Sequence, residues 1–320
     1  MNRAILVNGK GRTSALVTGG AGFIGSYVAA ALHALGWHVE VLDNLSAGSA
    51  ANVPAGITLH SGDIRSDADL RAVMGSGRFD FIVHCAAQTS VERSMRDPDL
   101  DREVNLVGTR RLALVAKACG VRRFVFFSSG GGIYGETAEP ADERTMPTPR
   151  SYYGLHKYAA EELLRTEGLP YTILRPSNVY GPRQRCDAEG GVVAIFYQQL
   201  LAGEPLEIHG SGQQIRDFVY VSDVVGAVLA ALATGGDVIW NVASGEATSI
   251  IELAEAMAAA AGRPLGVRYR PRRVGDVHRS LLSPATLLAT GRWGPPLRLA
   301  EGLPLTLAEA GEVVHSGDTR

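Results

Sequence analysis

Cysteine and lysine are both rare in this chain of 320 residues. The three cysteines, Cys85, Cys119 and Cys186, have no spacing typical of a metal site, and the first two lie in apolar segments. We therefore expect reduced thiols, a cytoplasmic protein and no bound metal. Lysine is scarce relative to arginine, with three lysines against 28 arginines. A lysine at a chemically suggestive position is for this reason informative.

Excess charge of one sign and long apolar runs are also lacking. The formal net charge is −2 at pH 7, which gives no electrostatic reason to bind nucleic acid or an anionic membrane. Residues 1–13 are short and polar, without the apolar core of a signal peptide or the length of a membrane span. We expect them to be an extension before the first strand. Hydrophobic residues make up 46% of the chain, which is ordinary for a soluble globular enzyme.

The segment from Ala15 to Gly25, ALVTGGAGFIG, carries the strongest local signal. A short apolar run precedes three spaced glycines, and an apolar helix pattern follows them. Gly19 permits a tight turn, Gly22 lets the backbone approach a pyrophosphate, and Gly25 lets the helix pack closely on the strand. The segment therefore predicts a dinucleotide site at a helix N-terminus.

Asp43 follows the next apolar strand pattern, at residues 39–42. A carboxylate at this place accepts hydrogen bonds from both hydroxyls of an adenosine ribose and repels a 2′-phosphate. The site is thus predicted to bind NAD rather than NADP. The alternative is a structural strand-turn-helix unit with an incidental aspartate.

Alternating strand and helix patterns continue along the chain. Strands are predicted at residues 57–60, 79–84, 124–127 and 171–174, and helices at 67–74, about 98–119 and 151–167. Such units in succession predict an α/β fold, a Rossmann-like doubly wound parallel sheet. We expect residues 14–177 to form this NAD-binding domain, with parts of 215–245 returning to it. Residues 178–320 are expected to form mainly a smaller C-terminal α/β lobe for the substrate.

Tyr153 and Lys157 lie four residues apart in a predicted helix, so their side chains share one face. A lysine ammonium can lower the pKa of a phenol and hold ribose hydroxyls in a small space. Ser129 follows a predicted buried strand and can hydrogen-bond the substrate oxygen that Tyr153 deprotonates. Ser128 competes for this role on the sequence alone. In the alternative reading, both serines only satisfy backbone groups of a turn, and the Tyr–Lys pair is an ordinary surface pair.

A series of short motifs resembles the extended short-chain dehydrogenase/reductase family. In chain order they are GGAGFIG, Asp43–Ser46, Gly62–Ile64, His84–Gln88, FSSGGGIYGE, Tyr153–Lys157 and Asn178–Gln184. Residues 188–196, 216–221 and 273–276 extend the resemblance to the NAD-dependent epimerases/dehydratases, and among these to UDP-glucose 4-epimerases. The resemblance runs from about residue 14 to residue 302.

The resemblance implies a role for each residue that matches a family motif. As catalytic residues it implies Ser129, Tyr153 and Lys157. As residues that bind NAD it implies Gly19, Gly22, Phe23, Ile24, Gly25, Asp43, Asn44, Asp63, Ile64, Ala86, Ala87, Gln88, Asn105, Tyr153 and Lys157. As residues that bind a sugar nucleotide it implies Thr89, Ser129, Tyr153, Asn178, Val192, Arg216, Arg273, Asp276 and Ser280. An arginine fork suits phosphate oxygens and an aspartate suits ribose hydroxyls, so these assignments are chemically consistent.

A nucleotide-sugar 4-epimerase is the activity that the resemblance implies, most directly on UDP-glucose and UDP-galactose. Tyr153 would take the proton of the sugar 4-hydroxyl while hydride passes to tightly bound NAD, and the 4-keto sugar would turn over and take the hydride back. One alternative is a 4-epimerase or 4-ketoreductase of a uronate or deoxysugar nucleotide. Another is a non-catalytic NAD-binding sensor.

The chain departs from the family pattern at several places. Gly130 and Gly131 stand where related 4,6-dehydratases carry an acidic pair, which argues against dehydration. Ser280 stands where some relatives carry a bulky aromatic residue, which leaves N-acetylated sugars open as substrates. Residues 162–170 shorten a helix that often forms a dimer interface, so we expect a homodimer with an altered interface. Arg185 replaces an acidic residue and could meet a sugar carboxylate.

Overall fold

A seven-stranded parallel sheet forms the centre of the computed structural model, which describes residues 12–76, 78–186, 190–272 and 277–317. Its strand order is β11-β6-β5-β4-β1-β2-β3, and every neighbouring pair is parallel. The strands are β1 (Ser14–Thr18), β2 (His38–Asp43), β3 (Thr58–Ser61), β4 (Phe81–His84), β5 (Arg123–Phe127), β6 (Tyr171–Pro176) and β11 (Val238–Val242). The doubly wound parallel sheet predicted from the sequence is confirmed.

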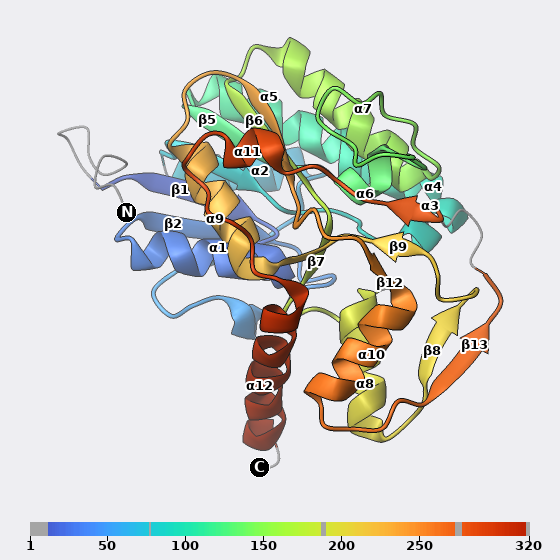
Figure 1. Cartoon of the computed structure of the whole chain (residues 1–320). Coiled ribbons are helices and arrows are strands. Elements are labelled where there is room, and N and C mark those ends of the chain that lie inside the picture. The colour runs from blue at the N-terminus through green and yellow to red at the C-terminus, as the bar shows by residue number, and fades with distance from the viewer. Residues whose placement is uncertain (1–11, 77, 187–189, 273–276, 318–320) are drawn as a thin grey trace.

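Helices cover both faces of this sheet (Figure 1). One face carries α1 (Phe23–Ala34), α9 (Val221–Leu232) and the short α11 (Ala285–Leu288), and the other carries α2 (Asp67–Ser76), α5 (Thr109–Ala118) and α7 (Tyr152–Glu167). Strand β1 shows why both faces are apolar. Ala15 and Val17 pack in the core beneath α1 and α9, whereas Leu16 packs beneath α5 and α7.

A smaller group of elements follows β6 and lies at one side of the sheet (Figure 1). Its strands are β7 (Asn178–Tyr180), β8 (Leu206–His209), β9 (Ile215–Arg216), β10 (Phe218–Tyr220), β12 (Thr248–Ser249), β13 (Val267–Arg270) and β14 (Arg279–Ser280). Its helices are α8 (Val192–Ala202), α10 (Ile250–Ala260) and α12 (Leu299–Gly317). Phe196, Leu253 and Met257 belong to a separate apolar core between these elements. β9 is the central strand of a three-stranded sheet, between β12 and β14.

The helix predicted at about 98–119 is interrupted. The structure has α4 (Pro98–Arg102), a π-helical turn at Glu103–Gly108, and then α5. Asn105 lies in this wide turn, and its Nδ2 donates to the Asp101 carboxylate at 2.9 Å. Thr109 Oγ1 donates to the Asn105 carbonyl at 2.8 Å. Such wide turns are frequent at functional sites, and this one directs Asn105 toward the carboxyl edge of the sheet, where Gln88 lies.

Candidate active site

The glycine turn between β1 and α1 has the geometry of a phosphate cradle. Gly19 has a φ of +69°, and a Cβ on it would lie 2.6 Å from the Ala86 nitrogen. A Cβ on Gly25 would collide with the Gly19 carbonyl. Helix α1 begins at Phe23 after Gly22, which offers no side-chain cap. Its first N–H groups therefore face the space at the sheet edge, where an anion can accept their hydrogen bonds.

Asp43 lies at the end of β2 and fixes this turn. Its Oδ2 accepts a hydrogen bond from the Ala21 nitrogen at 2.9 Å, and its Oδ1 accepts one from the Leu45 nitrogen at 2.8 Å. The carboxylate thus joins the glycine turn to the loop after β2. Each carboxylate oxygen has further lone pairs, so the group can also accept hydroxyls of a ribose.

Asn44, which follows Asp43, is hydrogen-bonded to Asp63, and both are predicted to bind NAD. Asn44 Nδ2 donates to Asp63 Oδ2 at 2.8 Å. Arg65 was not predicted from the sequence, yet it grips both oxygens of Asp63, at 3.0 and 2.7 Å. This hydrogen-bonded guanidinium is the main reason that the pKa of Asp63 falls to about 2. The spacing of two residues between Asp63 and Arg65 was the only local signal for the pair.

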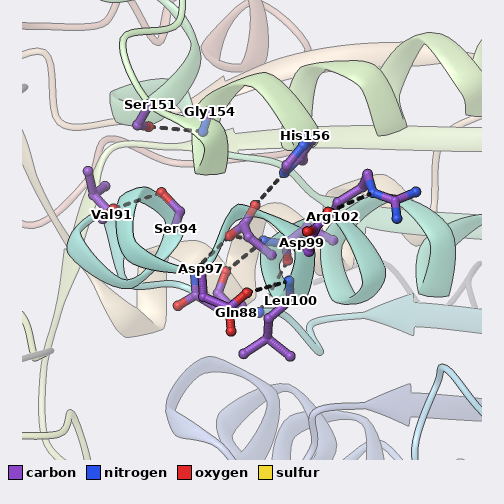
Figure 2. A network of polar contacts seen from close by, with 12 residues as sticks. Gln88, Val91, Ser94, Asp97, Asp99, Leu100, Arg102, Ser151, Gly154 and His156 are labelled. Carbon is purple, nitrogen blue, oxygen red and sulfur yellow. Dashed lines mark hydrogen bonds and ion pairs between the residues drawn. The ribbon is translucent and has the colours of Figure 1, made fainter.

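Gln88 and Asn105 bond to each other and to a buried carboxylate, Asp101. Gln88 Nε2 donates to Asp101 Oδ1 at 2.6 Å, and Asn105 Nδ2 donates to the Gln88 carbonyl at 2.9 Å. His156 Nδ1 lies 2.7 Å from Asp101 Oδ2, and Figure 2 shows His156 pointing from its helix toward this network. Because His156 lies between Tyr153 and Lys157 on α7, the network connects the predicted cofactor groove to the helix of the predicted catalytic pair.

Lys157 is buried against the end of β5. Its Nζ donates to the Phe127 carbonyl at 2.7 Å and lies 4.7 Å from the centre of the Phe126 ring. Burial lowers its pKa to about 8, although the negative charge of Asp101 acts in the opposite direction. The ammonium is therefore held in one position beneath the cofactor groove.

Tyr153 and Ser129, two of the predicted catalytic residues, are hydrogen-bonded neighbours, and we term this pair the catalytic wall. Burial raises the pKa of Tyr153, and a hydrogen bond with the Ser129 side chain acts against this rise. Ser129 caps the short helix α6 (Gly130–Ile133), where its Oγ also accepts from the Gly132 nitrogen at 3.1 Å.

The structure separates the two serines at the end of β5. Ser129 lines a cavity together with Tyr153. The Ser128 hydroxyl is buried, and the described part of the chain provides no hydrogen-bond partner for it. Ser129 is therefore the serine that a substrate in this cavity can meet, and the choice that the sequence left open falls on it.

The cavity has a volume of about 1070 Å³ and extends from the catalytic wall to the smaller group of elements. It is lined by every predicted substrate residue that the structure describes: Thr89, Ser129, Tyr153, Asn178, Val192, Arg216 and Ser280. Arg273 and Asp276, also predicted, lie outside the described residues. A cavity of this size and length can hold a sugar nucleotide.

Asn178 and Arg216 are fixed by backbone contacts at the far part of the cavity. Asn178 Nδ2 donates to the Asp217 carbonyl at 2.9 Å, and Arg216 Nη2 donates to the Val277 carbonyl at 2.8 Å. Asp217 is fully buried and accepts hydrogen bonds from Ser177 and from Ser244. The sequence analysis named Arg216 but not Asp217, whose backbone carbonyl holds the Asn178 side chain.

The glycines after Ser129 give the catalytic wall its shape. A Cβ on Gly132 would lie 3.0 Å from both Ser129 Oγ and Tyr153 Cε1, so a side chain there would press on both residues. A Cβ on Gly131 would lie 3.8 Å from Ser280 Oγ, an ordinary contact. Gly131 and Ser280 therefore lie close together in the lining of the cavity, and both are small.

No group of three or more His, Cys, Asp or Glu side chains in residues 12–76, 78–186, 190–272 and 277–317 could hold a metal ion. Among the same residues, no helix combines the length and apolar character that crossing a bilayer requires.

The chain resembles known proteins over most of its length. The model of the NAD dependent epimerase/dehydratase family matches residues 15–243. A UDP-glucose 4-epimerase of Mycolicibacterium smegmatis is 42% identical over 308 residues, which cover 91% of this chain and 96% of that protein.

Two solved structures are similar over nearly the whole chain. A UDP-glucose 4-epimerase of Thermotoga maritima, crystallised with UDP-glucose, has a TM-score of 0.91 and 38% identity, and the match covers 94% of this chain and 100% of that one. A UDP-glucose 4-epimerase of Thermus thermophilus, in complex with NAD, has a TM-score of 0.90 and 42% identity, with coverage of 93% and 99%.

Proposed function

This chain belongs to the NAD dependent epimerase/dehydratase family, and from that premise we propose that it is a nucleotide-sugar 4-epimerase that interconverts UDP-glucose and UDP-galactose. The relative from Mycolicibacterium smegmatis and the two solved structures all carry the name UDP-glucose 4-epimerase. NAD is the cofactor of the family, and the residues of the glycine turn fit it.

One observation carries the proposal: the catalytic wall and the diphosphate residues line the same cavity. The residues Ser129, Tyr153, Asn178 and Arg216 all belong to its lining. A sugar nucleotide is extended, with a neutral sugar at one end and a charged diphosphate in the middle. It can therefore place its sugar at Tyr153 while Arg216 faces its phosphates.

The fit to NAD rests on the shape and donors of the first turn. At Gly19 and Gly25 the turn packs against neighbouring backbone atoms too closely for a Cβ, and Asp43 keeps the turn in place. Asp43 would accept the ribose hydroxyls, and Lys157 would lie beneath the groove. Bound there, NAD would supply a reversible hydride acceptor for C4 of the sugar.

The proton transfers belong to residues of the chain. Tyr153 accepts the proton of the 4-hydroxyl as C4 is oxidised, and the same phenol returns it to the 4-oxygen after the sugar has turned over. Ser129 hydrogen-bonds the phenol and would hold the 4-oxygen beside it. The ammonium of Lys157 favours the phenolate electrostatically. No net redox change remains, so one bound cofactor serves many turnovers.

Small residues near Ser129 and Tyr153 favour a wider range of sugar nucleotides as substrates. Gly130 and Gly131 supply no acid or base for the removal of water, which disfavours a dehydratase. Gly131 and Ser280 both line the cavity and carry little or no side-chain bulk. We therefore include UDP-GlcNAc and UDP-GalNAc among the proposed substrates.

We also propose a homodimer in the cytoplasm. Leu114 on α5 and Tyr152 and Leu155 on α7 expose large apolar side chains, and α5 contacts α7. A second copy could cover these helices. Light scattering coupled to gel filtration tests the dimer, and a monomeric mass would exclude it.

The activity is tested by incubating the purified protein with UDP-galactose and measuring UDP-glucose by an endpoint assay with UDP-glucose dehydrogenase. Conversion is expected without added NAD. A protein that contains NAD yet converts no UDP-hexose would contradict the epimerase and favour the sensor.

A further inference from the structure

The segment Val277–Ser280 contributes to the wall of the cavity beside the glycines that follow Ser129. Val277 and Ser280 line the cavity, and Ser280 lies beside Gly131, where an added Cβ would be 3.8 Å from its Oγ. Ser280 belongs to β14, which pairs with β9 at Arg216. The position of this segment therefore sets the width of the cavity beside the predicted sugar site.

Glu136 holds the segment Val277–Ser280 through two hydrogen bonds to its backbone. Its Oε2 accepts a hydrogen bond from the His278 nitrogen and its Oε1 accepts one from the Arg279 nitrogen, each at 2.7 Å. Two successive backbone N–H groups thus share one carboxylate, from a residue 142 positions away in the chain. Hydrogen bonds to a carboxylate are short and stronger than neutral ones.

Glu136 is also directly connected to the catalytic wall. It follows Gly135, which lines the cavity itself, and it lies close in sequence to α6, the helix capped by Ser129. Arg216 also bonds to this segment, by donating a hydrogen bond to the Val277 carbonyl. The segment is therefore held at its N–H groups by Glu136 and at a carbonyl by Arg216.

We propose that Glu136 is a positioning residue that fixes the width of the sugar end of the cavity by holding His278 and Arg279 against the catalytic glycine loop. The proposal rests on the proposed function in one respect, that a sugar nucleotide occupies this cavity. Glu136 touches no reacting atom. Loss of the Glu136 carboxylate leaves the chemistry of Tyr153 intact. The segment Val277–Ser280 must then become ordered each time substrate binds, and this entropic cost weakens binding of the substrate and of the transition state equally.

The test compares Glu136→Gln with Glu139→Gln, since both glutamates are exposed in the same loop and Glu136 accepts the His278 and Arg279 N–H groups. Glutamine keeps the shape of Glu136 but lacks the charge and one of the two acceptor oxygens. We expect Glu136→Gln to raise the KM for UDP-galactose about ten-fold while kcat stays within about two-fold. Glu139→Gln is expected to match the unaltered protein.

Hydrogen–deuterium exchange gives a readout that needs no activity. The peptide containing His278 and Arg279 should exchange faster in Glu136→Gln than in Glu139→Gln, both loaded with NAD. Equal exchange in the two variants, or an unchanged KM, would overturn the proposal, as would a fall in kcat at constant KM. If the unaltered protein converts no UDP-hexose, the proposed function fails, whereas the exchange comparison still decides whether Glu136 holds the wall.

Discussion

Lys157 Nζ donates a hydrogen bond of 2.7 Å to the carbonyl oxygen of Phe127. Phe127 is the last residue of β5, and the chain reaches Ser129 two residues later. This bond therefore ties α7, which carries Tyr153, to the strand that positions Ser129. The three predicted catalytic residues share one anchor at the carboxyl edge of the sheet.

Replacing Tyr153 by Phe tests the catalytic base. We expect kcat for UDP-galactose to fall by about three orders of magnitude, since general base catalysis contributes on that scale. Bound NAD, measured after denaturing the protein, should remain. Tyr152→Phe is the matched control, because Tyr152 is exposed and stacks on His156 through its ring. Equal loss in both variants would count against the assignment.

Lys157 gives the stability of the protein a distinct pH dependence. Burial lowers its pKa from 10.5 to about 8. Between these values the unfolded chain binds more protons than the folded one, so the contribution of Lys157 to the free energy of unfolding rises with pH in this window. Over the full window the rise is about 3 kcal/mol. Lys157→Met should remove it.

Urea denaturation between pH 8 and 10 measures this effect. The control is Lys117→Met, since Lys117 is exposed and should leave the rise in place. Parallel pH curves for Lys157→Met and the unaltered protein would show that Lys157 does not titrate in this range.

Asp43→Asn tests the link between the glycine turn and the cofactor. The amide nitrogen would oppose either the Ala21 or the Leu45 N–H group, both of which donate to the carboxylate. We expect the affinity for NAD to fall by about ten- to a hundred-fold and the preference over NADP to shrink. Titration calorimetry on protein stripped of cofactor measures both. Asp99→Asn, on the exposed side of α4, should bind NAD as before.

Alanine at Gly132 and at Gly131 should act differently. A Cβ at Gly132 would crowd Ser129 and Tyr153, so we expect kcat to fall by about a hundred-fold. A Cβ at Gly131 makes only an ordinary contact with Ser280. Gly131→Ala should keep activity on UDP-galactose and lose it selectively on UDP-GalNAc. Steady-state kinetics with both sugars decide this, and the reverse ranking would contradict the geometry.

The sheet and the glycine turn could be predicted because their signals are local. Apolar runs, glycine spacing and Asp43 lie within thirty residues of one another, roughly the length of one strand-helix-strand unit. The π-helical turn at 103–108 was not predicted, since the helical period continues through it. Its cause is a set of bonds from Asn105 to Asp101 and to Gln88, and the second of these depends on tertiary structure.

Contacts between distant segments account for what the sequence did not reveal. Nothing in the sequence distinguishes His156 from an ordinary helix residue, because its partner Asp101 is brought beside it only by the fold. Glu136 meets the His278 backbone only in the folded chain. The choice between Ser128 and Ser129 depends on which way the chain turns after β5, and adjacent residues of identical type carry no signal for it.

Proton NMR with UDP-galactose deuterated at C4 tests the central claim most directly. The protein is purified without added NAD, and the anomeric signals are followed in ordinary water. The proposed mechanism predicts UDP-glucose that retains deuterium at C4, because the hydride leaves and returns to one carbon within the cavity. Deuterium lost to solvent, or no conversion with or without added NAD, would contradict it.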